Sequence, residues 1–457
     1  MNIRISFLLM LLTFSLLSAK LRAQESQLFF TGAKPQENLL NPSIYYDSTV
    51  VVISPFAQFQ ISNNSFGFRN AIAENNLGTN YWDIDYMLEN ANDKNRLNLE
   101  LNYSFLFINK KIKNGLFATF SINRNNSYNF LIPKDLLELS KGNVNYQDET
   151  ARNFDLSGLS VSSFSYTSFS MGLIKKISPV FTLGAHIKLL KGHYLTQTNK
   201  FKALLNTRGN LEETYLEADI NYRQSAPLMY GFGSANNTYG IDDFPGQFFW
   251  HNSLFKNLGA AIDVGFTYSP DDRTTFSGSV TDLGFIRWNQ NQVQVKINGN
   301  YTFGGLDISP DQEGKINIGE SFNTLMDTLN ATFDPKTNDS TNFTTYLPSK
   351  IYFGMKRKLN EKVDLFGVFR ANISSFYNDY RYTLGANYRP KNWLLINLTT
   401  SYKNNTFGNL GAGCVLNFKR VQFFVVTENI DFALFNSRSL NVAAGLNYNL
   451  LSVFTPR

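Results

Sequence analysis

The sequence lacks the residues from which disulfide frameworks and most metal centres are built. Its 457 residues include a single cysteine, Cys414, and three scattered histidines, His186, His193 and His251. One cysteine excludes an internal disulfide and any cysteine-built metal site. Three dispersed histidines argue against a histidine-centred metal site, so we expect no metal and no other cofactor.

Charge and catalytic motifs are scarce as well. Charged residues make up 17% of the chain and hydrophobic residues 43%, a balance that excludes a disordered or coiled-coil protein. The formal net charge of +6 is too small an excess to indicate nucleic-acid binding. The sequence has no phosphate-binding loop, no His-Glu-x-x-His zinc pair and no Gly-x-Ser-x-Gly nucleophile elbow. We therefore expect a protein that is not an enzyme.

The first 23 residues have the pattern of a secretory signal peptide. Arg4 provides the positive start, residues 5–17 are almost unbroken apolar, and residues 21–23 form a cleavage site before Gln24. The alternative, a membrane anchor, is less favoured because a spanning helix needs about 20 apolar residues. No later stretch reaches that length, so an exported protein embedded in a membrane has to be a β-barrel.

The rest of the chain alternates apolar and polar residues, which is the period of a β-strand. Residues 97–108, 380–388 and 440–450 each place apolar side chains on one face and mostly polar or small ones on the other. Segments of about ten residues match the length of a tilted membrane strand. The connections alternate between short basic turns and long polar loops, as in an outer-membrane barrel with periplasmic turns and external loops.

We therefore predict an all-β fold, a closed antiparallel transmembrane β-barrel of about fourteen strands within residues 49–457. The predicted strands are 49–60, 97–108, 115–123, 164–175, 180–191, 258–268, 274–287, 348–358, 363–372, 379–388, 393–403, 406–418, 421–428 and 438–450. The long external loops are expected at 62–96, 124–163, 192–257 and 288–347. A strand hidden in 199–257 or 291–303 would change the count.

A soluble β-sandwich or propeller is the alternative, since it shows the same alternation with its apolar face buried. Two features favour the barrel. The polar faces hold Asn, Ser, Thr and Gly with few Lys or Glu, which suits a crowded lumen. Aromatic residues also gather near strand ends, as at Tyr388 and Trp393, where interface girdles require them.

A lumen enclosed by fourteen strands is too wide for wall side chains alone to fill. One candidate to occupy it is the N-terminal segment, residues 24–48, acting as a plug. The long loops are the other candidate. Within them, Pro133 and the residues that follow it indicate a short helix in 132–139.

Five charged residues fall on polar strand faces and form a predicted lumenal polar cluster. They are Lys188, Asp263, Asp282, Arg370 and Arg381. An unpaired charge in a narrow lumen is costly, so these groups should pair with one another or with the backbone of the plug. Binding of a substrate is the alternative role.

Two further features lie at strand ends. Trp288 ends a strand before a long loop, where an aromatic side chain can anchor at the membrane interface or stack on a ligand. The short turns are rich in lysine and arginine. Such turns suit anionic lipid groups or a periplasmic partner, or are plain solvated turns that discourage aggregation at strand edges.

Residues 258–288, LGAAIDVGFTYSPDDRTTFSGSVTDLGFIRW, resemble the hallmark of an uncharacterised outer-membrane family of Bacteroidota, domain of unknown function 5723. Its members show an Asp-Leu-Gly strand, a short turn and a strand ending in Asp-Leu-Gly-Phe-Ile-x-Trp. The second element is complete here and consists of Asp282, Leu283, Gly284, Phe285, Ile286, Arg287 and Trp288. Residues 35–43, 132–143 and 184–192 also resemble family segments.

The resemblance implies an outer-membrane location, and an architecture similar to fatty-acid-transporter-like barrels and to barrels that accompany type IX secretion. It supplies no activity and no catalytic residues. We hypothesise a non-enzymatic protein of the cell outer membrane of a Gram-negative bacterium, an accessory or partner in protein secretion or surface-protein handling. The alternative is a channel or transporter for small hydrophobic molecules. Expected partners are outer-membrane lipid and other outer-membrane or secretion-system proteins, and not nucleic acid.

Overall fold

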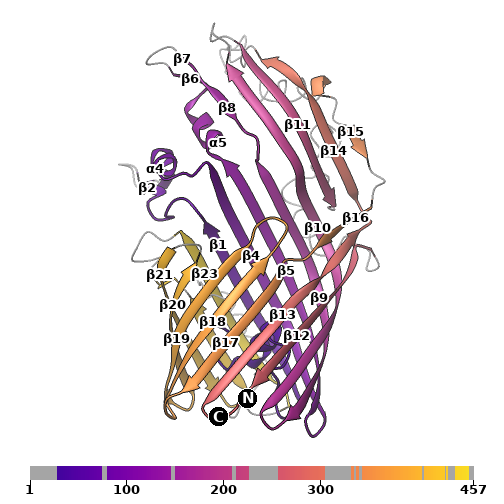
Figure 1. The fold of residues 1–457 in the computed structure, drawn as a ribbon, viewed down its shortest axis with the longest axis vertical. Helices are drawn as coiled ribbons and strands as arrows, with labels where there is room; N and C mark the ends of the chain where they lie inside the picture. Colours follow the sequence, from indigo (N-terminus) through magenta and orange to yellow (C-terminus); the bar gives the residue numbers. More distant parts are fainter. Residues whose placement is uncertain are drawn as a thin grey trace, which may run out of the picture.

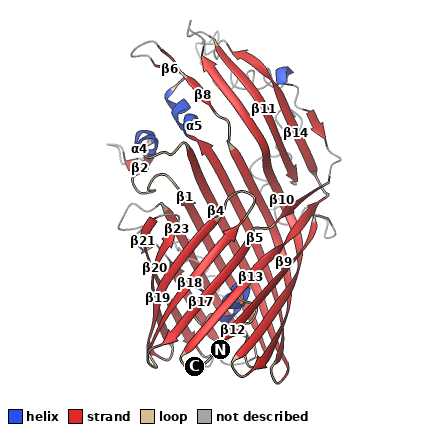
Figure 2. Ribbon diagram, in the orientation of Figure 1, coloured by secondary structure: helices blue, strands red, loops and turns tan. Residues whose placement is uncertain are grey.

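The computed structural model describes residues 28–74, 80–145, 150–207, 213–225, 256–303, 331–333, 336–338, 342–403, 406–427, 429–430 and 438–451. Strands dominate these residues, with a few short helices between them (Figure 2). None of the described helices is long and apolar enough to cross a membrane. The predicted signal peptide, residues 1–23, lies outside the described residues and stays a prediction.

Fourteen antiparallel strands close into a barrel (Figure 1). The ring closes because its first strand, β1, pairs with β4 on one side and with the last strand, β23, on the other. Closure leaves no unpaired strand edge in the ring. The barrel strands are β1 (Val50–Asn63), β4 (Lys94–Lys113), β5 (Leu116–Pro133), β9 (Ser160–Ser178), β10 (Phe181–Thr207), β12 (Leu258–Tyr268), β13 (Thr274–Trp288), β17 (Ser349–Lys358), β18 (Val363–Ile373), β19 (Asp379–Lys391), β20 (Leu394–Lys403), β21 (Thr406–Phe418), β22 (Val421–Thr427) and β23 (Ser439–Asn449). The predicted fold class and strand count are confirmed.

Four barrel strands, β4, β5, β9 and β10, are longer than predicted because they continue beyond the ring into a projecting wall (Figure 1). The upper part of β10, residues 195–207, pairs with β11, and β11 pairs with β14. The further strands are β8 (Asn153–Asp155), β11 (Thr214–Ser225), β14 (Gln292–Phe303), β15 (Lys336–Asn338) and β16 (Phe343–Tyr346), and the small hairpins β2 (Ile72–Glu74) with β3 (Asn80–Trp82) and β6 (Val144–Asn145) with β7 (Thr150–Ala151). Strands therefore do lie within 199–257 and 291–303, but they belong to the wall and leave the barrel count unchanged.

Apolar side chains face outward and polar side chains face inward, the reverse of a soluble protein. Ile187 and Leu384 are 68% and 65% exposed, whereas Asn397 and Asn447 are fully buried. An apolar exterior of this extent is stable against hydrocarbon, and a lumen lets the inward polar groups pair with one another. The soluble sandwich or propeller is thereby excluded.

The described helices are short and lie both inside and outside the barrel (Figure 2). α3 (Lys34–Leu40) lies inside, whereas α4 (Ile84–Glu89), α5 (Lys134–Glu138) and the 3₁₀ helix η1 (Leu139–Lys141) lie at the end with the projecting wall. The helix predicted after Pro133 is thus present as α5, but its predicted place in the lumen is wrong. Because β5 runs on to Pro133 instead of ending near residue 123, the helix begins outside the barrel.

The largest apolar cluster fills the lumen around α3. It joins residues 28–40 to the inner faces of β1 and of strands between β17 and β23. Its members are Leu28, Phe29, Phe30, Ala33, Leu40, Phe56, Tyr352, Phe366, Val368, Leu395, Val415, Phe424, Val426, Val442 and Ala443. The core of this barrel is therefore built between its wall and its own N-terminal residues.

Candidate functional site

The N-terminal segment, here residues 28–48, crosses the lumen from one side of the barrel to the other. On one side, Asn387 Nδ2 of β19 donates to the carbonyl oxygen of Phe30 (2.9 Å). On the other side, Asn41 Nδ2 donates to the carbonyl oxygen of Phe266 in β12 (3.1 Å). The segment thus occupies the space that wall side chains cannot fill.

The first half of the segment is held by aromatic packing. Phe29 stacks on Tyr352 with ring centroids 5.6 Å apart, and Phe30 lies 5.8 Å from the ring of Phe366. Gly354 makes room for these rings, since a Cβ at that position would lie 2.8 Å from Phe30 Cε2. Aromatic pairs of this kind contribute about 0.5–1.5 kcal/mol each beyond the area that they bury.

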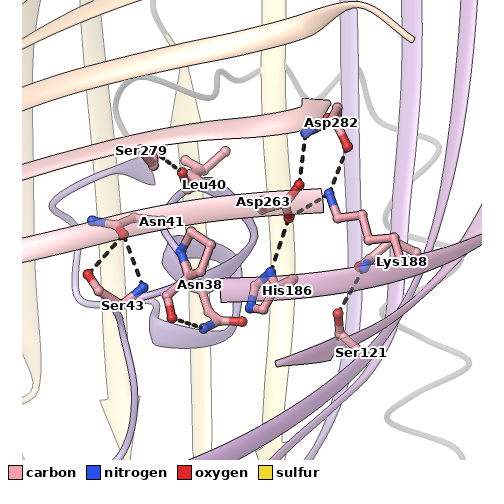
Figure 3. A network of polar contacts seen from close by, with 12 residues as sticks. Asn38, Leu40, Asn41, Ser43, Ser121, His186, Lys188, Asp263, Ser279 and Asp282 are labelled. Carbon is pink, nitrogen blue, oxygen red and sulfur yellow. Dashed lines mark hydrogen bonds and ion pairs between the residues drawn. The ribbon is translucent and has the colours of Figure 1, made fainter. Parts of the chain in front are cut away.

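The second half of the segment is held by short polar contacts with β12 and β13 (Figure 3). Ser279 Oγ donates to the carbonyl oxygen of Leu40 (2.5 Å), and the hydroxyl oxygens of Ser43 and Thr267 lie 2.7 Å apart. Hydrogen bonds between neutral groups contribute about 0.5–1.5 kcal/mol each. This half is therefore bound by several weak contacts.

Two wall glycines form a notch in which this half of the segment sits. A Cβ at Gly184 would lie 2.2 Å from the carbonyl oxygen of Pro42, and one at Gly265 would lie 2.2 Å from Asn41 Oδ1. Backbone atoms cannot yield as a flexible side chain can, so the close approach at Gly184 requires glycine. Residues 40–43, 184–192 and 263–265, which belong to separate family-like segments of the sequence, meet at this notch.

A charged cluster adjoins the notch on the inner faces of β10, β12 and β13 (Figure 3). Lys188 Nζ donates to Asp263 Oδ2 (2.8 Å) and to Asp282 Oδ1 (2.7 Å). His186 Nδ1 lies 3.1 Å from the same Asp263 Oδ2. Asp263 is fully buried and Lys188 is 8% exposed, so one ammonium group holds two carboxylates in a space with little water.

A β-bulge places the second carboxylate. The pairing of β12 with β13 shifts between Ile262 and Val264, so Thr281 and Asp282 lie opposite the single residue Asp263. Asp282 has a positive φ of 62°, a conformation that aspartate tolerates better than most residues. Asp263 Oδ1 stabilises it by accepting a hydrogen bond from the Asp282 N–H (2.8 Å). The bulge thereby turns Asp282 toward Lys188.

The structure brings together three of the five charged residues of the predicted lumenal cluster, Lys188, Asp263 and Asp282. The other two lie on different strands, where Arg370 of β18 and Arg381 of β19 face each other as a cross-strand pair. Arg370 Nη1 lies 3.9 Å from Asp379 Oδ2. The predicted single cluster is therefore two groups on the inner wall.

His186 belongs to the first group, although it is not a member of the predicted cluster. The signal that could have placed it there is its spacing, since it lies two residues before Lys188 on the same face of β10. Its register partner on β12 is Asp263. The register of β10 against β12 is therefore the signal that identifies the contact.

Trp288, which ends the family-like motif, is fully buried, so its predicted role as an interface anchor is wrong. It lies on the inner face of β13, where its Nε1 donates to Thr345 Oγ1 (2.8 Å). Its ring reaches over β12 to Gly192 of β10. A Cβ at position 192 would lie only 2.8 Å from the Trp288 ring. The apolar cluster around it contains Tyr166, Leu190, Leu195, Ala261, Ile286 and Leu347. The outward positions of the motif are instead Leu283 and Phe285.

We expect Trp288→Ala to destabilise the barrel by about 3–5 kcal/mol, the usual cost of emptying a buried aromatic site. Urea unfolding of the protein in phospholipid vesicles measures this loss. Trp393→Ala is the matched control, since Trp393 is 45% exposed at the opposite end of the barrel. Equal losses for the two variants would contradict the placement of Trp288.

A cavity of about 60 Å³ lies between the N-terminal segment and the wall, beside the charged cluster. Lys188, Asp282, Gln58 and Asn123 contribute to its lining, together with Leu40 from the segment. Within the described part of the chain, Gln58 Nε2 and Asn123 Oδ1 have no hydrogen-bond partner. The cavity therefore has room for water beside these two polar groups.

Metal-binding chemistry finds no support in the described residues. No three His, Cys, Asp or Glu side chains among them are grouped as ligands for a metal ion. The position that a cation would take between Asp263 and Asp282 is filled by the Lys188 ammonium group. The site is a polar lining of the lumen in contact with the N-terminal segment.

Comparison with known families identifies the chain. The model of a family of unknown function, DUF5723, matches residues 47–428. The chain belongs to the DUF5723 family. This match covers most of the sequence and includes the motif around Trp288 and the charged cluster. No curated protein has a significant sequence match to this DUF5723 member.

Several solved outer-membrane barrels are similar in architecture. The Pseudomonas putida toluene transporter TodX has 10% identity and a TM-score of 0.40, covering 94% of each chain. A Pseudomonas aeruginosa FadL homologue has 10% identity and a TM-score of 0.39, covering 91% of this chain and 92% of its own. The translocator domain of the autotransporter NalP from Neisseria meningitidis has 8% identity and a TM-score of 0.32, covering 94% and 99%. Likenesses this distant carry no information about what this chain binds.

Proposed function

We propose that this protein is a channel for small hydrophobic molecules across the outer membrane, with its N-terminal segment as the gate. The observation that carries the proposal is an apolar surface on the inner wall beneath the N-terminal segment. Tyr352, Phe366 and Val368 form part of that surface, and Phe29 and Phe30 of the segment pack with them. A pathway for polar solutes does not need such a surface, whereas a pathway for hydrophobic ones does.

A second apolar zone lies on the inner wall beyond the charged cluster. Leu190, Ile286 and Trp288 are fully buried there, on the same strands that carry Lys188 and Asp263. A hydrophobic molecule entering the barrel would meet this zone first and the surface beneath the segment afterwards. Such a molecule would take over the wall contacts of Phe29 and Phe30. It would therefore bind the open arrangement, in which the segment has left the wall, more tightly than the closed one, and shift the protein toward it.

The transport test compares the wild-type protein with a variant that lacks residues 24–43, both reconstituted in vesicles. We expect the wild type to admit a small fluorescent aromatic hydrocarbon and to exclude a sugar of similar size. The truncated variant should admit both, because the gate is gone. Faster entry of the sugar than of the hydrocarbon through the wild type would show a general porin and contradict the proposal.

A second candidate function is that of a partner in protein secretion or surface-protein handling in a Bacteroidota outer membrane. The observation that favours it is the projecting wall of β10, β11 and β14, a surface that a small-molecule channel does not need. This wall exposes charged pairs such as Lys202 with Glu217, 2.7 Å apart. Recovery of secretion components with the wild type, and their loss when the wall is replaced by a short turn, would support this role.

A further inference from the structure

The short-turn end of the barrel carries exposed basic side chains that the proposed function does not use. We call these residues the collar; they lie in or beside the six short connections of the ring. The eleven exposed members are Lys110, Lys113, Lys175, Lys176, Arg273, Arg357, Lys358, Lys362, Lys391, Lys419 and Arg420. The exposed acidic side chains of the described residues at this end are Asp47, Asp271, Asp272 and Glu361. The collar is therefore strongly positive, although the whole chain carries a formal charge of only +6.

Two of the four acidic groups are already engaged. Asp47 Oδ1 lies 3.5 Å from Lys111 Nζ, and Asp271 Oδ1 accepts the backbone N–H groups of Arg273 (2.7 Å) and Thr274 (2.6 Å). These backbone hydrogen bonds hold the turn that contains Asp271 and lower the pKa of its carboxyl group. Four carboxylates therefore face eleven exposed basic side chains, so the collar keeps a net positive charge.

At the opposite end of the molecule, several exposed lysines pair with acidic side chains. Lys141 pairs with Asp85, Lys200 pairs with Asp219, and a further lysine in the wall pairs with a glutamate. At the turn end, by contrast, Lys175, Lys358 and Lys419 have no acidic partner among the described residues. The charge of these three lysines is thus open to a ligand from outside the chain.

Apolar side chains at the same level show what surrounds the collar. Ile177, Leu359 and Phe418 are about half exposed, at 53%, 51% and 46%, and each directly adjoins a collar lysine in the sequence. Trp393 stacks on Phe418 with ring centroids 5.9 Å apart. Exposed aromatic and aliphatic groups beside lysines are typical of the boundary between hydrocarbon and lipid headgroups.

The position of single collar residues agrees with this boundary. Met171 and Leu173 of β9 are 66% and 54% exposed on the outer face, and Lys175 continues the same face. Its aliphatic stem can therefore lie along hydrocarbon while its ammonium group reaches the headgroups. Collar residues also come from all six turns around the ring, which suits lipids that surround a barrel better than a protein that contacts one side.

We propose that the collar binds the anionic headgroups of phospholipids in the periplasmic leaflet. Lysine and arginine recognise phosphate through charge-assisted hydrogen bonds, and basic groups near an anionic membrane surface add attraction that salt screens. The collar thereby fixes the depth of the barrel in the membrane and concentrates anionic lipid around its turn end. This role does not depend on what passes through the lumen.

The test uses the full mature chain in mild detergent with an equimolar mixture of phosphatidylglycerol and phosphatidylcholine. Native mass spectrometry counts the molecules of each lipid that stay bound. The collar variant carries Lys358→Gln, Lys362→Gln, Lys391→Gln and Lys419→Gln. The control removes the same charge from the other end with Lys134→Gln, Lys141→Gln, Lys200→Gln and Lys202→Gln.

We expect several-fold more bound phosphatidylglycerol than phosphatidylcholine for the wild type and the control, and at least a halving of this preference for the collar variant. High salt should reduce the wild-type preference, a result that does not depend on the folding of any variant. Equal binding of the two lipids by the wild type would overturn the proposal, as would a preference that salt leaves unchanged. Loss of an acidic periplasmic protein from the collar variant, without any lipid preference in the wild type, would assign the collar to a protein partner instead.

Discussion

Replacing Lys188 with methionine lowers the stability of the barrel by about 3–5 kcal/mol, the cost of leaving buried charge without its partner. Lys188 is the ammonium group between Asp263 and Asp282, at 2.8 and 2.7 Å from their oxygens. Methionine keeps an unbranched side chain of nearly the same length and removes its charge, so two carboxylates then face each other in the wall. Urea unfolding in phospholipid vesicles measures the difference in free energy.

Lys200→Met is the matched control, because it removes a lysine that pairs with Asp219 on the exposed surface of the projecting wall. Exposed ion pairs contribute little, so this variant should unfold like the wild type. Asp282→Asn should fall between the two, since Lys188 then still neutralises Asp263. Identical stability of the Lys188 and Lys200 variants would contradict a structural role for the charged cluster.

Replacing Gly184 with alanine displaces the second half of the N-terminal segment and raises the ion conductance of the barrel several-fold. The new Cβ would lie 2.2 Å from the carbonyl oxygen of Pro42 and 2.6 Å from the backbone nitrogen of Ser43. Since this half of the segment is held by weak polar contacts, it should leave the notch before the barrel wall deforms. Single-channel recording in planar bilayers measures the conductance.

Gly367→Ala serves as the control for the same substitution elsewhere in the wall. Its Cβ would meet the flexible end of Leu384 at 3.3 Å and no part of the N-terminal segment. Both variants should keep the heat-modifiable migration of a folded barrel on a gel. If Gly184→Ala conducts no more than Gly367→Ala, the segment does not close the lumen at this notch.

The barrel itself was predictable because membrane strands impose a two-residue period and because short and long connections must alternate around a closed ring. The projecting wall was not predictable. Residues 123–127 of β5 are Asn-Arg-Asn-Asn-Ser, a polar stretch that indicates a loop. In the structure they pair with β4 and β9. Once a strand leaves hydrocarbon, its outward face no longer has to be apolar, so alternation stops marking where the strand ends.

The candidate site was predictable in part for a similar reason. Alternation tells which face of a strand a residue occupies, and this places Lys188, Asp263 and Asp282 in the lumen. It does not tell at which height or on which side of the ring a residue lies, so Arg370 and Arg381 of β18 and β19 were grouped with residues of β10, β12 and β13. The docking of residues 40–43 was hidden too, because contacts between a segment and a distant wall leave no local period.

The central claim is that the N-terminal segment docks on β12 and closes the lumen, and an engineered disulfide tests it most directly. Ser43→Cys and Thr267→Cys are introduced together with Cys414→Ala, because the hydroxyl oxygens of Ser43 and Thr267 lie 2.7 Å apart. We expect the two cysteines to link in the membrane, and uptake of the fluorescent hydrocarbon to be blocked until a reductant is added. Thiols that stay free, or uptake that is the same before and after reduction, would contradict the claim.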